Sequence, residues 1–148
     1  MPAAAGYWPL PDGIVLRTAE APRDLAPIAD LYNAAFGRVS AEAVTPQRVA
    51  RFAFHPGLNP LGVFLAFDGE QAVGLGVARL SVPAGGKTDH RGAVELLAVR
   101  PQYQRRGLGH ALLATILAWL EGQGVTRVEV GTDRPAVIGL LRQHGFRE

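Results

Sequence analysis

The segment "AVELLAVRPQYQRRGLGHALL", residues 93–113, decides which fold the sequence favours. Its first part, 93–99, is a nearly continuous apolar run, which is typical of a strand in the middle of a sheet. Residues 100–104 form a short connection, and a helical pattern runs from about 107 to 122. No charged residue lies between His110 and Glu121. Most of this helix is therefore expected to be buried against the sheet.

The rest of the chain alternates strand and helix patterns around this unit. Hydrophobic periodicity, read together with caps and turn residues, predicts a strand over 13–19, helices over 23–37 and 45–54, strands over 62–67 and 72–82 around the turn 68–71, a polar loop over 83–92, a strand over 93–99, a helix over 107–122, a strand over 126–130 and a helix over 134–145. This order predicts a single α/β domain. Its sheet is expected to be mixed but largely antiparallel, with helices on both faces.

Local signals support several of these boundaries. Asp24 can cap the first helix, and Thr45 can cap the second, in which Pro46 takes the first position. Asp68 and Gly69 lie between two β-rich runs, and this pair is a good hairpin signal.

Length and composition limit the classes of function. The 148 residues fit one domain, and a net charge of +2 gives no general attraction for nucleic acid. The absence of cysteine excludes disulfides, thiolate nucleophiles and cysteine metal sites. The start has no secretory pattern, and no apolar run reaches the length of a membrane span. We expect a cytoplasmic protein without membrane or nucleic-acid partners, in which residues 1–12 form a flexible arm ahead of a domain over 13–148.

The junction between the central strand and the long helix has the properties of a phosphate site. A helix start leaves N–H groups without partners, and its dipole adds positive charge there. Gly107 and Gly109 let the backbone approach a bulky anion, while Arg105 and Arg106 add charged donors. The segment lacks the Gly-Lys-Ser/Thr of a P-loop and the three-glycine dinucleotide pattern. A plain glycine-rich turn is the alternative, but the strand, loop and buried helix around it favour a pyrophosphate site.

With these residues the sequence resembles the GNAT superfamily of acyl-CoA-dependent N-acetyltransferases. The family signature Gln/Arg-x-x-Gly-x-Gly/Ala matches residues 104–109, "QRRGLG", which follow a strand ending in "LAV" and the loop "RPQY". The closing "LLRQHGF" and the order of elements from Gly13 to Phe146 also match. The first half, with "LYNAAFG" and "HPGLNPLGVFLAF", is similar to domains related to mycothiol synthase. The resemblance implies transfer of an acetyl group from acetyl-CoA, as co-substrate, to a primary amine of a small molecule or peptide.

The resemblance also implies a donor site. In such enzymes the backbone amides of the signature turn hold the pyrophosphate of coenzyme A, and the pantetheine arm lies along the preceding strand like an additional strand. A main-chain N–H of that strand stabilises the oxyanion. The matching positions are Leu97, Ala98, Val99, Gln104, Arg105, Arg106, Gly107, Leu108, Gly109 and His110. No metal is expected, because the four histidines lie far apart without metal-type spacing.

Glu95 is the candidate catalytic residue. It is the only ionisable side chain in the central strand, and a carboxylate there can take the proton of an attacking amine. Period-2 alternation places it on the same face as Leu97 and Val99. The alternative is a structural carboxylate paired to Arg91 or Arg127. Weaker candidates for the base are Asp89, His90 and Glu148.

Two positions and the C-terminus depart from the family pattern. Arg134 stands where the family often has an asparagine that contacts the cofactor, and Leu141 stands where it often has a tyrosine that protonates the thiolate. Family members usually continue past "GF" with one or two strands. The C-terminal strands are therefore expected to be short or missing: either the chain is truncated, or a partner subunit, such as a second copy in a homodimer, covers that edge. These departures leave a non-catalytic acyl-CoA-binding or regulatory domain as the alternative function.

Overall fold

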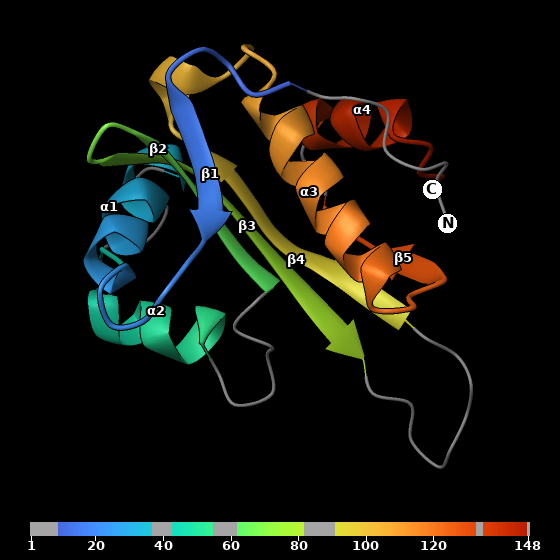
Figure 1. The fold of residues 1–148 in the computed structure, drawn as a ribbon, viewed down its shortest axis with the longest axis horizontal. Coiled ribbons are helices and arrows are strands. Elements are labelled where there is room, and N and C mark those ends of the chain that lie inside the picture. The colour runs from blue at the N-terminus through green and yellow to red at the C-terminus, as the bar shows by residue number, and fades with distance from the viewer. Residues whose placement is uncertain (1–8, 37–42, 55–61, 82–90, 133–134, 148) are drawn as a thin grey trace.

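The computed structural model describes residues 9–36, 43–54, 62–81, 91–132 and 135–147 (Figure 1). The elements within these ranges are β1 (Ile14–Thr18), α1 (Leu25–Phe36), α2 (Pro46–Ala53), β2 (Val63–Asp68), β3 (Gln71–Ser81), β4 (Arg91–Val99), α3 (Leu108–Gly122), β5 (Arg127–Glu129) and α4 (Pro135–Gln143). Their order is the predicted one. A short 3-10 turn, Pro101–Tyr103, connects β4 to α3.

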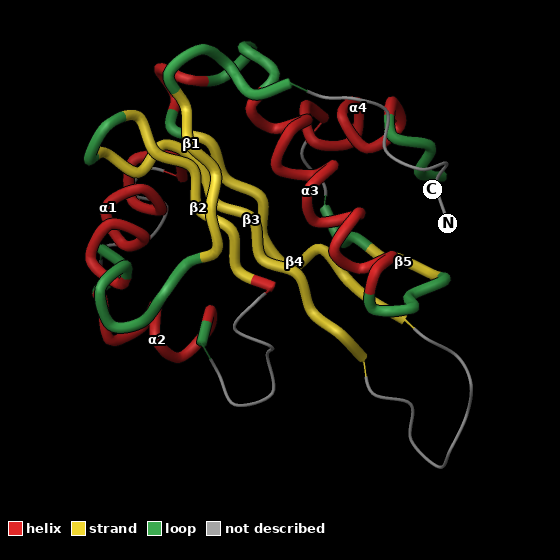
Figure 2. The backbone as a smooth tube through the Cα atoms, viewed as in Figure 1, coloured by secondary structure: helices red, strands yellow, loops and turns green. Residues whose placement is uncertain are grey.

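The described strands form one sheet of five in the order β1-β2-β3-β4-β5. The first four strands are antiparallel, and β5 is parallel to β4. Helices α1 and α2 cover one face, and α3 and α4 lie on the other (Figures 1 and 2). Each face has its own apolar core, centred on residues such as Leu31 and Leu75 under α1 and on Leu112 and Ile116 under α3. The predicted α/β architecture with helices on both faces is confirmed.

Helix α3 lies close to the sheet because glycines form the surface beneath it. A Cβ added to Gly76 would lie 2.6 Å from Cδ1 of Ile116, and one added to Gly92 would lie 2.8 Å from Cδ2 of Leu120. Leu108 and Leu112 meet Gly74 in the same way. The apolar stripe of α3 therefore fits into a row of missing side chains, and this fit determines how far the start of α3 stands from the end of β4.

Strand β4 begins earlier than expected. The sequence predicts a loop over 83–92, whereas Arg91 and Gly92 belong to the strand. Both residues pair with β3 on one side and with β5 on the other, so tertiary pairing extends the strand into the glycine-containing segment. The remainder of the predicted loop, 82–90, lies outside the described residues, as do residues 1–8 of the predicted arm. Leu10 of that arm packs against the core around Leu108 and Leu112.

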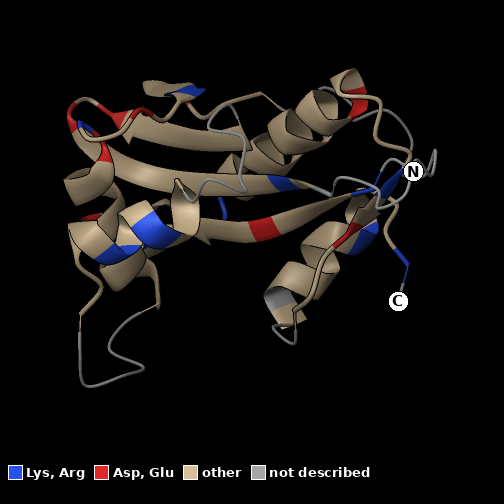
Figure 3. Cartoon of the chain, turned by 90° about the horizontal axis from the view of Figure 1, so that it is seen from below, with Lys and Arg blue, Asp and Glu red and all other residues tan. Residues whose placement is uncertain are grey.

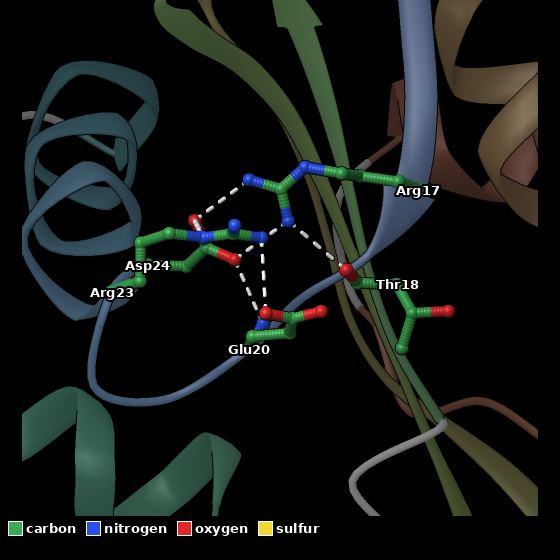
Figure 4. A network of polar contacts seen from close by, with 5 residues as sticks. All are labelled: Arg17, Thr18, Glu20, Arg23 and Asp24. Atoms are coloured by element: carbon green, nitrogen blue, oxygen red, sulfur yellow. Dashed lines mark hydrogen bonds and ion pairs between the residues drawn. The ribbon is translucent and has the colours of Figure 1, made fainter.

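A partly buried ion pair joins the end of β1 to the residue before α1 (Figure 4). The Asp24 side chain is 2% exposed and accepts two hydrogen bonds from the Arg17 guanidinium, at 2.7 and 2.8 Å. It also accepts one from the backbone N–H of Glu20, at 2.7 Å. The Arg17 guanidinium in turn lies over the Phe67 ring, 4.5 Å from its centroid. Asp24 precedes α1 as predicted, and its carboxylate binds Arg17 and the preceding turn.

This arrangement makes the fold sensitive to acid. Hydrogen bonds from Arg17 hold the pKa of the Asp24 carboxyl below its ordinary value of 3.8. A carboxyl whose pKa is lower in the folded state contributes stability that is present above the unfolded pKa. That contribution is lost as the pH falls through the folded pKa.

We expect Asp24→Asn to lower the free energy of unfolding at pH 7 by about 2 kcal/mol, because it removes a buried charge-assisted pair. Below pH 4 the difference from the wild type should shrink. Urea unfolding at pH 7 and pH 3 measures both effects, with Asp12→Asn as a control at an exposed aspartate. A constant difference at both pH values would contradict the assignment.

Candidate functional site

Strand β4 and the edge strand β5 separate after a short contact. Strand β5 pairs with β4 only through Arg91–Ala93, so no described strand pairs with that side of β4 beyond Ala93. The N–H of Arg100 donates to the Val73 carbonyl at 2.8 Å, on the β3 side. Because backbone groups alternate along a strand, those of Leu97 and Val99 point to the opposite, open side. This edge has the backbone donors and acceptors that an extended ligand requires.

The start of α3 follows directly from this edge. Arg105 has φ 63°, and Gly107, the residue before α3, has φ 86°. A Cβ added to Gly107 would meet nothing within 4 Å among the described atoms. Glycine suits this position because the left-handed conformation strains residues that have a Cβ. The surface around Gly107 is also open. The first N–H groups of α3 have no intrahelical acceptors, so this end of the helix can receive an anion.

Gly109 has a different part in the site. A Cβ added there would lie 3.0 Å from Cδ1 of Leu140 in α4 and 4.0 Å from Cγ2 of Val99 in β4. Its missing side chain therefore allows α3 to pack against α4 and β4. The expectation that both glycines open the backbone toward a ligand is wrong for Gly109.

Side chains from three elements hold the loop between β4 and α3. Arg100 is buried, and its guanidinium donates to Asp30 of α1 at 2.7 Å and to the Ala72 carbonyl of β3 at 3.1 Å. Tyr103 donates through its hydroxyl to Asp68 at the end of β2. This contact raises the pKa of the Tyr103 hydroxyl above its ordinary value.

Gln104 reaches back to the open edge of β4. Its side-chain amide donates to the Val99 carbonyl at 3.1 Å. The residue that begins the signature turn is therefore in contact with the strand edge at which the turn is attached.

His110 and His144 form a pair that sequence reasoning missed. Nδ1 of His110 lies 2.9 Å from Nε2 of His144, and the rings are stacked with centroids 5.1 Å apart. Burial, and to a lesser degree His110, lowers the pKa of His144 below its ordinary value of 6.5. The pair connects His144, which follows α4, to the first turn of α3. The residues lie 34 positions apart, and the sequence contains no local signal for the contact.

A β-bulge at Glu95 changes the faces of β4. Leu96 lies opposite Val77, and Val94 lies opposite Ala78, so Glu95 is an extra residue without a partner position on β3. Val94 and Leu97 consequently share the core under α3, while Leu96 packs under α1 and α2. Period-2 alternation fails across this point.

Glu95 lies on the face opposite to the one predicted. Its carboxylate is ion-paired with Arg79 of β3, and both side chains are about half exposed. Arg79 follows Leu75 and Val77 on the face under α1 and α2. The expectation that Glu95 shares a face with Leu97 and Val99 is wrong, and its partner is Arg79 rather than Arg91 or Arg127. The antiparallel pairing of β3 with β4 places Arg79 opposite Ala93, two residues before Glu95. Pairing of these two consecutive strands was therefore the sequence signal that could have indicated the contact between Arg79 and Glu95.

Several other candidates cannot be placed. Asp89, His90, Arg134 and Glu148 lie outside the described residues, as does His55. Leu141 is buried in α4.

Within the described ranges, no group of three histidine or acidic side chains could hold a metal ion. None of the helices in those ranges is long and apolar enough to cross a membrane.

A pocket of about 390 Å³ lies between β5, α4 and the residues that follow α4. It is lined by Val128, Leu141, Phe146 and several arginines, and by none of the predicted donor-site residues. The predicted donor-site residues lie outside this pocket, at the open edge of β4 and the start of α3. Basic and acidic residues are interspersed along the chain (Figure 3).

Several known proteins are similar to this chain in sequence. Residues 25–146 match the Acetyltransferase (GNAT) family. The chain is 30% identical to the mycothiol acetyltransferase of Tsukamurella paurometabola, in a match that covers 93% of this chain and 50% of that protein. The chain thus spans about half the length of the curated relatives it matches. The name of these relatives agrees with the similarity of the first half to mycothiol synthase domains.

Solved structures show the same fold. The putative acetyltransferase from Agrobacterium tumefaciens superposes with a TM-score of 0.74 at 21% identity, covering 90% of this chain and 93% of that one. The GCN5-related N-acetyltransferase from Sphaerobacter thermophilus superposes with a TM-score of 0.73 at 25% identity, covering 99% of this chain and 44% of that one.

Proposed function

Because the chain belongs to the GNAT acetyltransferase family, we propose that it transfers an acetyl group from acetyl-CoA to a primary amine of a small molecule or peptide. The observation that carries the proposal is the position of the α3 start, with Gly107 in the left-handed region, directly beyond the open edge of β4. An anion site and a free strand edge in that order suit a ligand with a pyrophosphate at one end and an amide-bearing arm at the other.

The donor is bound mainly through the backbone. The N–H groups of Gly107, Leu108, Gly109 and His110 receive the pyrophosphate, and the outward groups of Leu97 and Val99 receive the pantetheine arm. Ala98, between them, faces β3 and maintains the sheet. Gln104, Arg105 and Arg106 flank the phosphates. Since recognition uses main-chain groups, the strand itself is free to be aliphatic.

Transfer proceeds by direct attack. The amine nitrogen forms a bond to the thioester carbonyl carbon, and the carbon–sulfur bond of the tetrahedral intermediate then breaks. The nucleophile is the neutral amine, and Glu95 accepts, directly or through water, the proton that the substrate ammonium loses before it can attack. Coenzyme A departs as a thiolate and takes its proton from solvent, because Leu141 has none to donate. A backbone N–H of β4 near the bulge stabilises the oxyanion.

The acceptor approaches from the face that carries Glu95. That face is the one covered by α1 and α2, whereas α3 lies on the other. The acceptor therefore reaches the donor at the open edge of β4, from the side opposite α3. The relatives are named mycothiol acetyltransferases, and this name favours a small-molecule amine as the acceptor. We place the reaction in the cytoplasm, with no metal and no nucleic-acid partner.

The function is tested by thiol release from acetyl-CoA with a panel of small amines, polyamines, amino acids and peptide N-termini. We expect turnover with at least one class of amine. Micromolar binding of acetyl-CoA without turnover on any acceptor would instead support a non-catalytic acyl-CoA-binding domain, the function that the buried Leu141 favours.

The donor site is tested by Gly107→Glu, with Gly124→Glu as its matched control. Both glycines have φ above 80° and open space around a built Cβ, but they lie at opposite ends of α3. Each substitution should therefore lower stability by a similar amount, about 1 kcal/mol. Only Gly107→Glu places a carboxylate at the phosphates, and calorimetry should show a loss of coenzyme A affinity of about 100-fold. Equal affinities of the two variants would remove the phosphate assignment.

The base is tested by Glu95→Gln, with Glu129→Gln as a control on the neighbouring strand. Glutamine cannot accept the amine proton, so kcat should fall about 100-fold while the KM for acetyl-CoA changes little. The rate should also gain steeper dependence on the fraction of unprotonated amine. An unaltered pH–rate profile would exclude Glu95 as the base.

A further inference from the structure

We propose that Arg106, rather than the adjacent Arg105, is the arginine that binds the phosphates of the donor, and that Tyr103 and Asp68 are its positioning residues. The inference rests on the proposed donor site, because it assigns unequal tasks to two arginines that the signature turn places side by side.

Arg106 is the arginine that the fold holds in place. Its guanidinium carbon lies 5.2 Å from the centroid of the Tyr103 ring, which is within the range of a cation–π contact. A cation–π contact uses none of the guanidinium N–H donors in a hydrogen bond, so these donors stay available to an anion. The contact therefore orients Arg106 and leaves it able to bind an anion.

Tyr103 is itself held from both sides. Its backbone N–H donates to the Arg100 carbonyl at 2.8 Å, and its hydroxyl donates to Asp68. Asp68 is the last residue of β2 and pairs with Gln71 across the hairpin turn. Arg100 is buried and bound to α1 and β3. The aromatic ring under Arg106 is thus connected to the rigid sheet.

Arg105 has no comparable support. It is exposed, and no hydrogen bond, ion pair or ring contact holds its side chain among the described residues. Ordering a free arginine on a ligand costs conformational entropy, and ordering one that is already stacked costs less. Both arginines carry the same charge, so the difference in preorganisation decides which of them contributes more to phosphate affinity.

Asp68 acts on Arg106 only through the tyrosine. Its carboxylate fixes the hydroxyl, and the ring then fixes the guanidinium. The β2–β3 hairpin turn, about 35 residues before the signature turn, is by this route part of the donor site. A sequence motif limited to 104–109 does not include it.

Calorimetric titration with coenzyme A tests the assignment of the arginines. Arg106→Ala should weaken binding about tenfold, and Arg105→Ala by less than about threefold. A loss for Arg105→Ala equal to or larger than that for Arg106→Ala would overturn the proposal. Both side chains are exposed, so both variants should retain the thermal unfolding midpoint of the wild type within a few degrees.

A double-mutant cycle tests the role of Tyr103. Tyr103→Leu should weaken binding about threefold, and Tyr103→Phe should weaken it less, because only the contact with Asp68 is lost. In the Arg106→Ala background neither substitution should cost anything further. The same loss in both backgrounds would show that Tyr103 supports the loop generally and would overturn its positioning role. Tyr32→Phe, which removes a tyrosine hydroxyl in α1, should leave affinity unchanged.

The outcomes separate this inference from the function on which it rests. If the wild-type chain does not bind coenzyme A, the donor site and the inference fail together. If it binds and Gly107→Glu abolishes binding, while the arginines are equivalent or the cycle is additive, the donor site stands and only the inference fails.

Discussion

The close packing of α3 on a row of glycines is the constraint on which the site depends. Gly74 and Gly76 of β3 and Gly92 of β4 leave a groove, and the apolar stripe of α3 fills it at distances that a Cβ would not permit. Because the interior is packed at this density, α3 has one position along the sheet. Its first turn consequently lies beyond the end of β4, where the backbone edge is open. The proposed phosphate site and the open strand edge lie next to each other for this reason.

The bulge at Glu95 is the second determinant, since it separates two kinds of chemistry within one strand. After the bulge, the backbone groups of Leu97 and Val99 face the open edge. At the bulge, the Glu95 carboxylate lies on the face under α1 and α2. A regular strand would have placed Glu95 on the α3 face. The extra residue thus places the Glu95 carboxylate, the proposed proton acceptor, on the side opposite α3 without interrupting the open edge of β4.

Polar contacts over long distances in the sequence then hold the start of α3 from several sides. Arg100 is bound to α1 and β3, Tyr103 to the end of β2, and His110 to His144 beyond α4. Each contact reaches a different element, so displacement of the turn would break several at once. Such preorganisation lowers the cost of binding a flexible, highly charged ligand, because less of the protein must be ordered when the ligand arrives.

The order of elements, the capping of α2 by Thr45, the hairpin at Asp68 and Gly69, and the burial of α3 all followed from local signals: periodicity, caps and turn residues act within a few positions. The signature turn was also readable, because glycine and arginine at a helix start have a direct physical meaning there. What the sequence did not reveal depended on residues far apart in the chain. The pairing of β4 on both edges made strand of a segment that was expected to be loop, and a bulge reversed the face of Glu95. Arg79, Asp68 and His144 entered the site through sheet register and helix packing, which no local pattern encodes.

The sequence alone determined the prediction of the donor, since an anion site at a helix start depends on the residues of that one start. Only the tertiary structure decided where the proton acceptor points and which charged residues are held in place, because these depend on which strand and helix lie alongside.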